Sequence, residues 1–410
     1  MTTRAGVGAL SAVLCMAACT PAPVPIDTIA EGYVRVALQL AQHDPGLIED
    51  WRGPRSWRPG PRQPVEPLLR RIEALRHDLE GHGEPASAAR RGYLTAQLAA
   101  LALSARRLLG ASSTFDEEAL QAFGPGPDAP DAQGAVAIRD ALSRELPGSA
   151  ALATRYAAFR NGLAVSPSKA DAVMRAALDA CRTATRQSYD LPADESVELV
   201  FAAGLEWDGY AQYLGSHRTR ISINERAALD VSRALRLACH EGYPGHHLQF
   251  MLIDDELVRR RGWREFELAP AFGRHLLIAE GAAEAAADLA FPFDARVAIY
   301  RDVLLPIAGL SAQSATTLAR VDDLIRALEP AAVAILRDYL DGRLTEAAAT
   351  DRLRVEALTQ NPEALLAFAE RRRTRVSAYS LGRESVLKLI GSGGLRAVGR
   401  LFGERPFALQ

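Results

Sequence analysis

The stretch RLACHEGYPGHHLQF, residues 236–250, holds three of the chain's eight histidines. Its start, His240 followed by glutamate, matches the zinc-protease signature His-Glu-x-x-His, in which two histidines one helical turn apart bind the metal. The second histidine of a regular signature would stand at position 244. That position is Pro244, and the next histidines are His246 and His247. The question is whether these side chains share a metal ion despite the longer spacing.

The Pro-Gly pair between the histidines indicates how they can share one metal ion. On an unbroken helix His246 would be rotated by about 240° from His240, and His247 would lie about 10.5 Å further along the axis. Pro244 has no N–H to donate to the carbonyl of His240, and its ring crowds that carbonyl, so the helix must widen or break. Gly245 accepts unusual backbone angles. We therefore predict a bulge that returns His246 to the metal side, with His247 as the alternative ligand.

A catalytic zinc takes three protein ligands and a water molecule, whose pKa it lowers, and Glu241 is placed to act as general base. The segment HLLIAEGAAEAAADLAF, residues 275–291, carries Glu280, Glu284 and Asp288 in one row at helical spacing. The row is either a solvated face or part of a buried ligand helix, and the small residues around it favour the second. In that interpretation Glu280 is the third zinc ligand, and Glu284 accepts a hydrogen bond from a ligating histidine.

Helical periodicity runs through nearly all of the chain after residue 28, so we predict a mainly α fold. One exception is SHRTRISINE, residues 216–225, whose polar and apolar residues alternate as in a half-buried strand. The loop FGPGPDAPDAQG, residues 123–134, lacks the character of a flexible linker. We expect a single helical domain over residues 29–410, with any subdomain boundary at that loop.

The chain begins MTTRAGVGALSAVLCMAACTP, which has an early arginine, a short apolar run and small residues before a cysteine. We interpret residues 1–18 as a lipoprotein signal peptide, Cys19 as the lipidated first residue of the mature chain, and residues 19–28 as a tether. The alternative is an ordinary secretory signal cut nearby. Lipidation would anchor the protein to the periplasmic side of the cell envelope, with the outer membrane as the expected site.

Net charge is −2 and the pI is about 6.5, so there is no basic excess of the kind that drives nucleic-acid binding. Two cysteines remain in the predicted domain, Cys181 and Cys239. An oxidising compartment permits a disulfide between them. Because nothing in the sequence shows that they are neighbours, we expect two buried free thiols.

The segments HEGYPGHHLQ and EGAAEAAADLAF together resemble the bacterial domain of unknown function 885 family, whose members are often exported lipoproteins and look like zinc metallopeptidases. The resemblance implies a zincin-like helical domain that holds one Zn²⁺. Carried over position by position, it implies His240, His246 and Glu280 as zinc ligands and Glu241 as general base.

The late segment RTRVSAYSLG, residues 373–382, resembles a family segment that ends in a tyrosine, two residues and a glycine. The resemblance makes Tyr379 a candidate donor to the oxyanion that forms when water attacks a carbonyl. The alternative is a core tyrosine. The predicted strand, at 219–224, would be a short edge strand before the motif helix and would offer its backbone to an extended peptide.

The leading hypothesis is therefore an envelope-anchored zinc metallopeptidase that cuts a peptide or protein substrate. One alternative is a non-catalytic or divergent helical envelope lipoprotein that retains a metal site. A structural zinc site is usually closed by four protein ligands, however, and has no use for Glu241. A third hypothesis, a metal-dependent hydrolase of other amides or esters, would use the same ligands.

Overall fold

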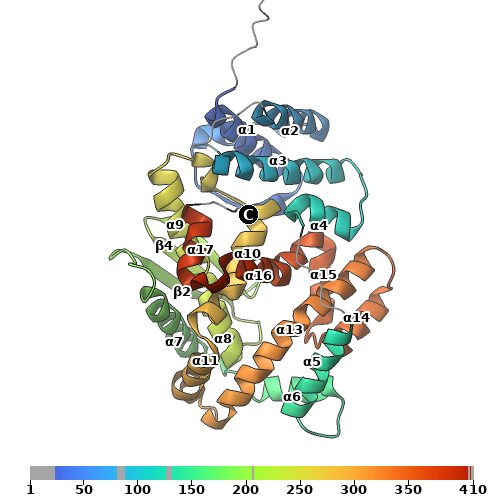
Figure 1. Cartoon of the computed structure of the whole chain (residues 1–410), viewed down its shortest axis with the longest axis vertical. Helices are drawn as coiled ribbons and strands as arrows, with labels where there is room; N and C mark the ends of the chain where they lie inside the picture. The colour runs from blue at the N-terminus through green and yellow to red at the C-terminus, as the bar shows by residue number, and fades with distance from the viewer. Residues whose placement is uncertain (1–23, 81–87, 126–131, 206, 405–406, 408–410) are drawn as a thin grey trace, which may run out of the picture.

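The computed structural model confirms a mainly α architecture (Figure 1). It describes residues 24–80, 88–125, 132–205, 207–404 and 407. The predicted signal peptide, Cys19 and the start of the tether lie outside these residues. The predicted tether extends too far, because helix α1 begins at Ile26. Among the helices that the structure describes, none is both long enough and apolar enough to cross a membrane.

The α-helices follow one another along most of the chain. In order they are α1 (Ile26–Leu40), α2 (Val65–Glu80), α3 (Ala88–Leu108), α4 (Phe115–Phe123), α5 (Ala132–Glu145), α6 (Leu152–Asn161), α7 (Pro167–Arg186), α8 (Val231–Leu237), α9 (His246–Ile253), α10 (Gly273–Ala290), α11 (Phe293–Ile299), α12 (Leu305–Ala308), α13 (Ala315–Leu340), α14 (Glu346–Val355), α15 (Pro362–Arg372), α16 (Ser377–Ile390) and α17 (Gly394–Gly403).

The strands and short helical turns connect these helices. The strands are β1 (Ile48–Trp51), β2 (Ser196–Ala202), β3 (Gly209–Gly215), β4 (Arg218–Asn224) and β5 (Leu268–Pro270). The short turns are η1 (Pro45–Leu47), η2 (Arg55–Trp57), η4 (Ala238–Gly242), η5 (Asp254–Arg259), η6 (Arg264–Glu267), η7 (Tyr300–Leu304), η8 (Ala312–Ser314), η9 (Arg373–Val376) and η10 (Gly391–Gly393).

Helix α10 lies at the centre of the molecule (Figure 1). Helices α1 to α3 pack together at one end, while the long helix α13 packs against α5, α14 and α15 towards the other. Helix α10 contacts α3 and α4 on one side and η4, α7 and α8 on another. The loop predicted as a boundary joins α4 to α5, and its residues 126–131 lie outside the described part of the chain.

Two glycines allow α10 and α16 to pack closely. A Cβ on Gly281 of α10 would lie 2.3 Å from the carbonyl carbon of Gly382 in α16. A Cβ on Gly382 would lie 2.6 Å from the carbonyl oxygen of Leu277. Only glycine at both positions permits this backbone contact. The glycine that ends the Tyr-x-x-Gly segment therefore packs α16 against the helix that carries Glu280.

The predicted strand exists as β4, but it is not an edge strand. The sheet order is β2-β4-β3, with β4 parallel to β2 and antiparallel to β3. Both backbone edges of β4 are already paired, so it has none to offer a peptide. The sequence pattern indicated one half-buried strand, whereas neighbours on both sides come from pairing that no local pattern specifies.

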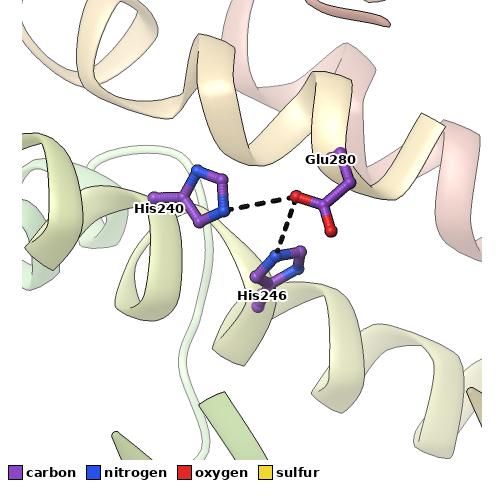
Figure 2. Close-up of side chains that lie close together, drawn as sticks. All are labelled: His240, His246 and Glu280. Atoms are coloured by element: carbon purple, nitrogen blue, oxygen red, sulfur yellow. Dashed lines mark ion pairs between the residues drawn. The ribbon is translucent and has the colours of Figure 1, made fainter. Parts of the chain in front are cut away.

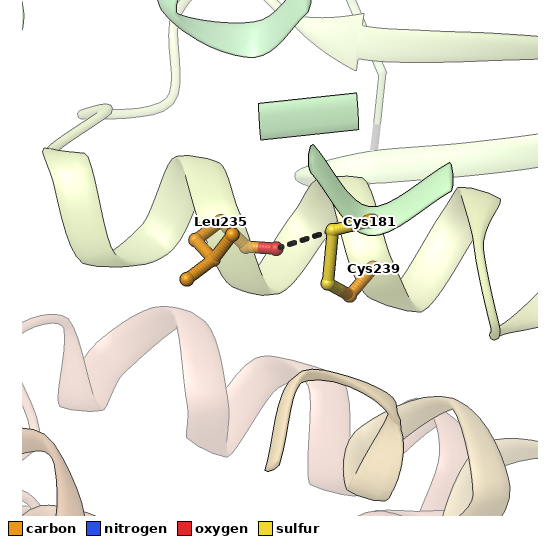
Figure 3. Close-up of a disulfide and its surroundings, with 3 residues drawn as sticks. All are labelled: Cys181, Leu235 and Cys239. Carbon is orange, nitrogen blue, oxygen red and sulfur yellow. Dashed lines mark hydrogen bonds between the residues drawn. A yellow bond between two sulfur atoms is a disulfide. The ribbon is translucent and has the colours of Figure 1, made fainter. Parts of the chain in front are cut away.

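Cys181 of α7 and Cys239 of η4 form a disulfide, with Cα atoms 5.4 Å apart (Figure 3). The prediction of two free thiols is therefore wrong, although both cysteines are fully buried as expected. The bridge forms because α7 packs along η4. A separation of 58 residues hides that contact from the sequence.

Candidate metal centre

Three side chains from three segments converge on one point (Figure 2). His240 comes from η4, His246 begins α9, and Glu280 lies in α10. One ligand atom from each lies within 4.8 Å of the others. The Glu280 Oε2 atom is 3.5 Å from His240 Nε2 and 3.7 Å from His246 Nε2. The structure thus brings together the three predicted zinc ligands.

The motif helix widens before it breaks. Its first turns are regular α8, with Asp230 as N-cap, and the chain then passes through the π turn η4. A cis Tyr243–Pro244 bond follows, and α9 starts at His246. A Cβ on Gly245 would lie 1.9 Å from the carbonyl oxygen of His240, so this close approach requires glycine. The predicted bulge is confirmed, and it turns His246 towards His240.

The second nitrogen of each converging imidazole has an acceptor. His240 Nδ1 lies 3.2 Å from Glu284 Oε1, and His246 Nδ1 lies 3.1 Å from Gln249 Oε1. An ionised carboxylate and an amide oxygen only accept, so both Nδ1 atoms donate, and this leaves the Nε2 atoms, which face Glu280, as the nitrogens that would bind a metal ion. Second partners of this kind fix the tautomer of zinc-binding histidines.

The donor set fits zinc, and two of the three separations between its ligand atoms are close to the spacing in a zinc site. Two imidazoles and one carboxylate are ligands that zinc prefers in catalytic sites. Tetrahedral zinc with bonds of about 2.0–2.2 Å holds its ligand atoms roughly 3.4 Å apart. The separations of 3.5 and 3.7 Å to Glu280 Oε2 are close to that spacing.

The charges of the cluster complement one another. Burial lowers the pKa of His240, but Glu280, Glu284 and Glu241 outweigh burial and raise it well above its usual range. Burial likewise raises the pKa of Glu280, but His240 and His246 outweigh it and hold this pKa well below its usual range. The acidic row on α10 is therefore part of a buried, paired network, so the solvated-face alternative is wrong.

His247 points away from the cluster. It is fully buried, with Nδ1 2.7 Å from Thr219 Oγ1 of β4 and Nε2 3.4 Å from Glu195 Oε2. Its ring meets that of Tyr243 edge to face. The structure therefore places His246 with the other donors and uses His247 to join the motif to the sheet.

Glu241 is buried beside the cluster, with 6% of its surface exposed. A Cβ on Gly209 of β3 would lie 3.1 Å from Glu241 Oε1, so the strand passes close to this carboxylate. Burial raises the pKa of Glu241, and His240 and His246 partly offset that rise. The carboxylate predicted as general base thus lies near the predicted ligands without belonging to their cluster.

Tyr379 lies near Glu280 and Arg375. Burial raises the pKa of its hydroxyl, Glu280 raises it further, and Arg375 lowers it. The hydroxyl consequently stays protonated and able to donate. Arg375 Nη2 is 3.7 Å from Glu280 Oε1 and also pairs with Glu49.

Three residues at the centre were missed by the sequence analysis. Arg236 Nη2 lies 3.1 Å from Glu284 Oε2, Gln249 supports His246, and Arg375 approaches Glu280. Arg236 and Gln249 stand four residues before His240 and three after His246, so helical spacing was a usable signal. Arg375 had no such signal, because only the tertiary fold brings α16 and η9 to α10.

Comparison with known proteins gives the fold and little more. No protein-family model matches the chain, and no curated protein matches it. A solved structure from Colwellia psychrerythraea, described as a candidate lipoprotein, aligns with a TM-score of 0.51 and 14% identity over 85% of this chain. This chain spans 66% of that structure's length.

A second solved structure, a candidate lipoprotein of unknown function from Shewanella oneidensis, aligns with a TM-score of 0.46 and 14% identity. The alignment covers 84% of this chain and 71% of that one.

Proposed function

We propose that this chain is a metal-dependent hydrolase of the cell envelope, and specifically a zinc metallopeptidase. The observation that carries the proposal is the convergence of His240, His246 and Glu280 within 4.8 Å beside a buried Glu241 that is not part of the cluster. A purely structural zinc site would be closed by a fourth protein ligand. Three donors with a neighbouring carboxylate are typical of a site that acts on water.

The chain's own residues divide the work of peptide hydrolysis. A zinc ion held by the three donors would supply Lewis acidity and lower the pKa of a water molecule. Glu241 accepts a proton at its carboxylate and returns it to the leaving nitrogen. Glu284 orients His240 through Nδ1, and Tyr379 donates its hydroxyl to the developing oxyanion.

The envelope location forms part of the same proposal. Its support is the lipobox-like sequence that ends at Cys19, together with two structural neighbours described as candidate lipoproteins. The resemblance to the domain of unknown function 885 family points the same way. We therefore propose a lipid anchor at Cys19 and a folded domain on the periplasmic side of the outer membrane.

A second candidate function is a non-catalytic envelope lipoprotein that retains the metal site. The comparisons favour this candidate, because the neighbours are described as candidate lipoproteins and neither description names an activity. The cation Arg375, 3.7 Å from Glu280, also competes with a metal ion for that carboxylate. The two functions differ in one property, the turnover of a peptide or another amide or ester.

The test is the variant Glu241→Gln, compared with wild type and with Glu225→Gln, which changes an exposed glutamate. We expect all three proteins to hold about one zinc, and only E241Q to lose cleavage across a broad peptide library and an ester and amide panel. Full activity of E241Q would refute the mechanism. Wild-type protein that holds zinc but cleaves nothing would establish the non-catalytic function instead.

Removal of the metal adds a second measurement. Chelation of a catalytic ion should abolish turnover and leave helicity largely intact, whereas loss of a structural ion would unfold much of the domain. Circular dichroism and peptide cleavage, followed on the same chelated sample, distinguish the two outcomes.

A further inference from the structure

A partly open cavity of about 80 Å³ lies beside the candidate metal centre. Its wall includes Leu276, one turn before Glu280 on the same face of α10, and Arg375, which itself approaches Glu280. One helical turn is a rise of about 6 Å between residues i and i+4. A group bound in the cavity is therefore close enough to belong to a molecule that reaches the metal centre.

The cavity is rich in guanidinium groups. Its lining includes Arg107, Arg371, Arg372 and Arg375, against the carboxylates of Asp44 and Glu118. Glu118 is already matched, because Arg107 pairs with it at 2.9 Å and Arg373 at 2.7 Å. Arg375 is matched too, because it pairs with Glu49, so Arg372 carries the unmatched positive charge at the wall that these two arginines form.

Two of these arginines have unused donors. Arg375 is 93% buried, and although it pairs with Glu49, its Nε has no hydrogen-bond acceptor. The Nε of Arg372 is also buried without an acceptor. Within the described residues, no carboxylate forms an ion pair with the Arg372 guanidinium, for which the limit is 4.0 Å. Both Nε atoms are closed to the cavity, so an anion there gains from the charge of Arg372, which has no carboxylate partner, and not from these two donors.

An indole ring holds both guanidinium groups in place. Trp207 lies 5.6 Å from the Arg372 guanidinium carbon and 5.3 Å from that of Arg375. Arg372 also packs against Gly46, which lines the same cavity, since a Cβ there would lie 1.6 Å from its Nη1. Because the Nε of Arg372 is buried, its two Nη groups are the donors that can meet a carboxylate in the cavity.

The volume of the cavity and the positive charge around it both suit a carboxylate. A void of about 10–15 Å³ holds one water molecule, so a cavity of about 80 Å³ has room for a carboxylate with the carbon atoms that carry it. The first residue of α10, Gly273, also lines the cavity. The positive end of an 18-residue helix thus adds to the charge of the arginines.

We propose that this cavity binds a carboxylate of the substrate, so that the metal centre acts on peptides with an acidic group near the scissile bond. This inference rests on the proposed hydrolase function for its consequence, but not for the binding itself. The carboxylate is either the free carboxyl terminus of a peptide or an Asp or Glu side chain. Both sources present the same chemistry to Arg372.

The test is calorimetric binding of four acetylated peptides to zinc-loaded full-length Glu241→Gln protein, which should not turn them over. The peptides are Ala-Ala-Ala-Glu and Ala-Ala-Ala-Gln, each with a free or an amidated carboxyl terminus. We expect peptides with a carboxylate to bind about tenfold tighter than the doubly neutral peptide, as expected for a charge-assisted pair. The two singly charged peptides show which carboxylate is preferred.

Substitution of the arginine must remove that preference. Adding Arg372→Gln should bring all four affinities to that of the neutral peptide, while Arg372→Lys should lose part of the preference and Arg226→Gln, which changes an exposed arginine, none. If Arg372→Gln retains the full preference, or the neutral peptide binds as tightly as the others, the proposal is wrong. Circular dichroism confirms that each variant is folded.

A metal-free arm separates this proposal from the proposed function. A carboxylate bound directly to zinc would lose its preference in His246→Ala, whereas one bound by Arg372 would keep it. Persistence of the preference in that variant supports the cavity even if the wild-type protein cleaves nothing. Its disappearance there refutes the cavity even if the protein proves to be a peptidase.

Discussion

The two segments that supply the candidate metal ligands are built in opposite ways. Helix α10 (Gly273–Ala290) is unbroken and presents its acidic row at regular spacing. The motif segment is divided into α8, the π turn η4 and α9. The continuous helix needs only burial to place Glu280. The divided segment needs outside contacts to hold two histidines in register, and every such contact is a point at which the site can fail.

Three contacts hold the divided segment. The disulfide joins Cys239 to α7, His247 bonds to the sheet, and Gly245 permits the return of the chain over His240. On α10, by contrast, the alanines around the acidic row are buried, and the row itself is paired with histidines and arginines. The difference predicts that changes in the motif segment disturb the metal site more than comparable changes in α10.

The largest expected effect is the difference in bound zinc between substitutions of the two adjacent histidines. His246→Ala removes one of three donors, so bound zinc should fall to background. His247→Ala should keep the zinc but lower the free energy of unfolding by roughly 2–4 kcal/mol, because it leaves buried polar partners unmatched. Metal analysis and urea unfolding measure the two effects. Zinc retained in the first variant and lost in the second would reverse the assignment.

The next effect tests the disulfide that joins η4 to α7. Replacing Cys181 and Cys239 together by serine opens a covalent loop of 58 residues. The chain-entropy estimate for such a loop is about 4 kcal/mol of unfolding free energy. Zinc affinity should fall as well, since His240 directly follows Cys239. A reductant should destabilise the wild type similarly and leave the double variant unchanged, and any other pattern would mean that the bridge is not formed.

Gly245→Ala should cost about 3 kcal/mol, because its Cβ would meet the carbonyl oxygen of His240 and the backbone must shift. The matched control is Gly92→Ala, at an exposed position in α3 where a Cβ meets nothing within 4 Å. That control should gain up to about 1 kcal/mol from helix propensity. Equal effects on thermal unfolding would show that the close approach does not occur.

The smallest effect concerns α10 itself. Glu284→Gln removes the charge that His240 Nδ1 faces, and we expect zinc affinity to fall about tenfold, as for other second partners of metal ligands. The control, Asp288→Asn, lies one turn further along the same row and pairs with arginines instead. Competition with a zinc-binding dye should detect a change only in the first variant; equal losses would indicate a general effect of charge on α10.

Residues near one another in the chain accounted for much of what could be predicted. The helical class and the strand at Arg218–Asn224 follow from periodicity within a few residues. The break at Pro244 does too, since the carbonyl that its ring crowds belongs to His240, one turn away. The buried acidic row was expected from the small residues around it.

Contacts between distant segments decided the rest. The pairing of Cys181 with Cys239 and the central place of β4 depend on segments far apart in the sequence. The sequence by itself determined that two neighbouring histidines follow a broken helix. Only the tertiary structure turned one towards Glu280 and the other towards Thr219, because a helix break frees the direction of a side chain and the packed neighbours then fix it.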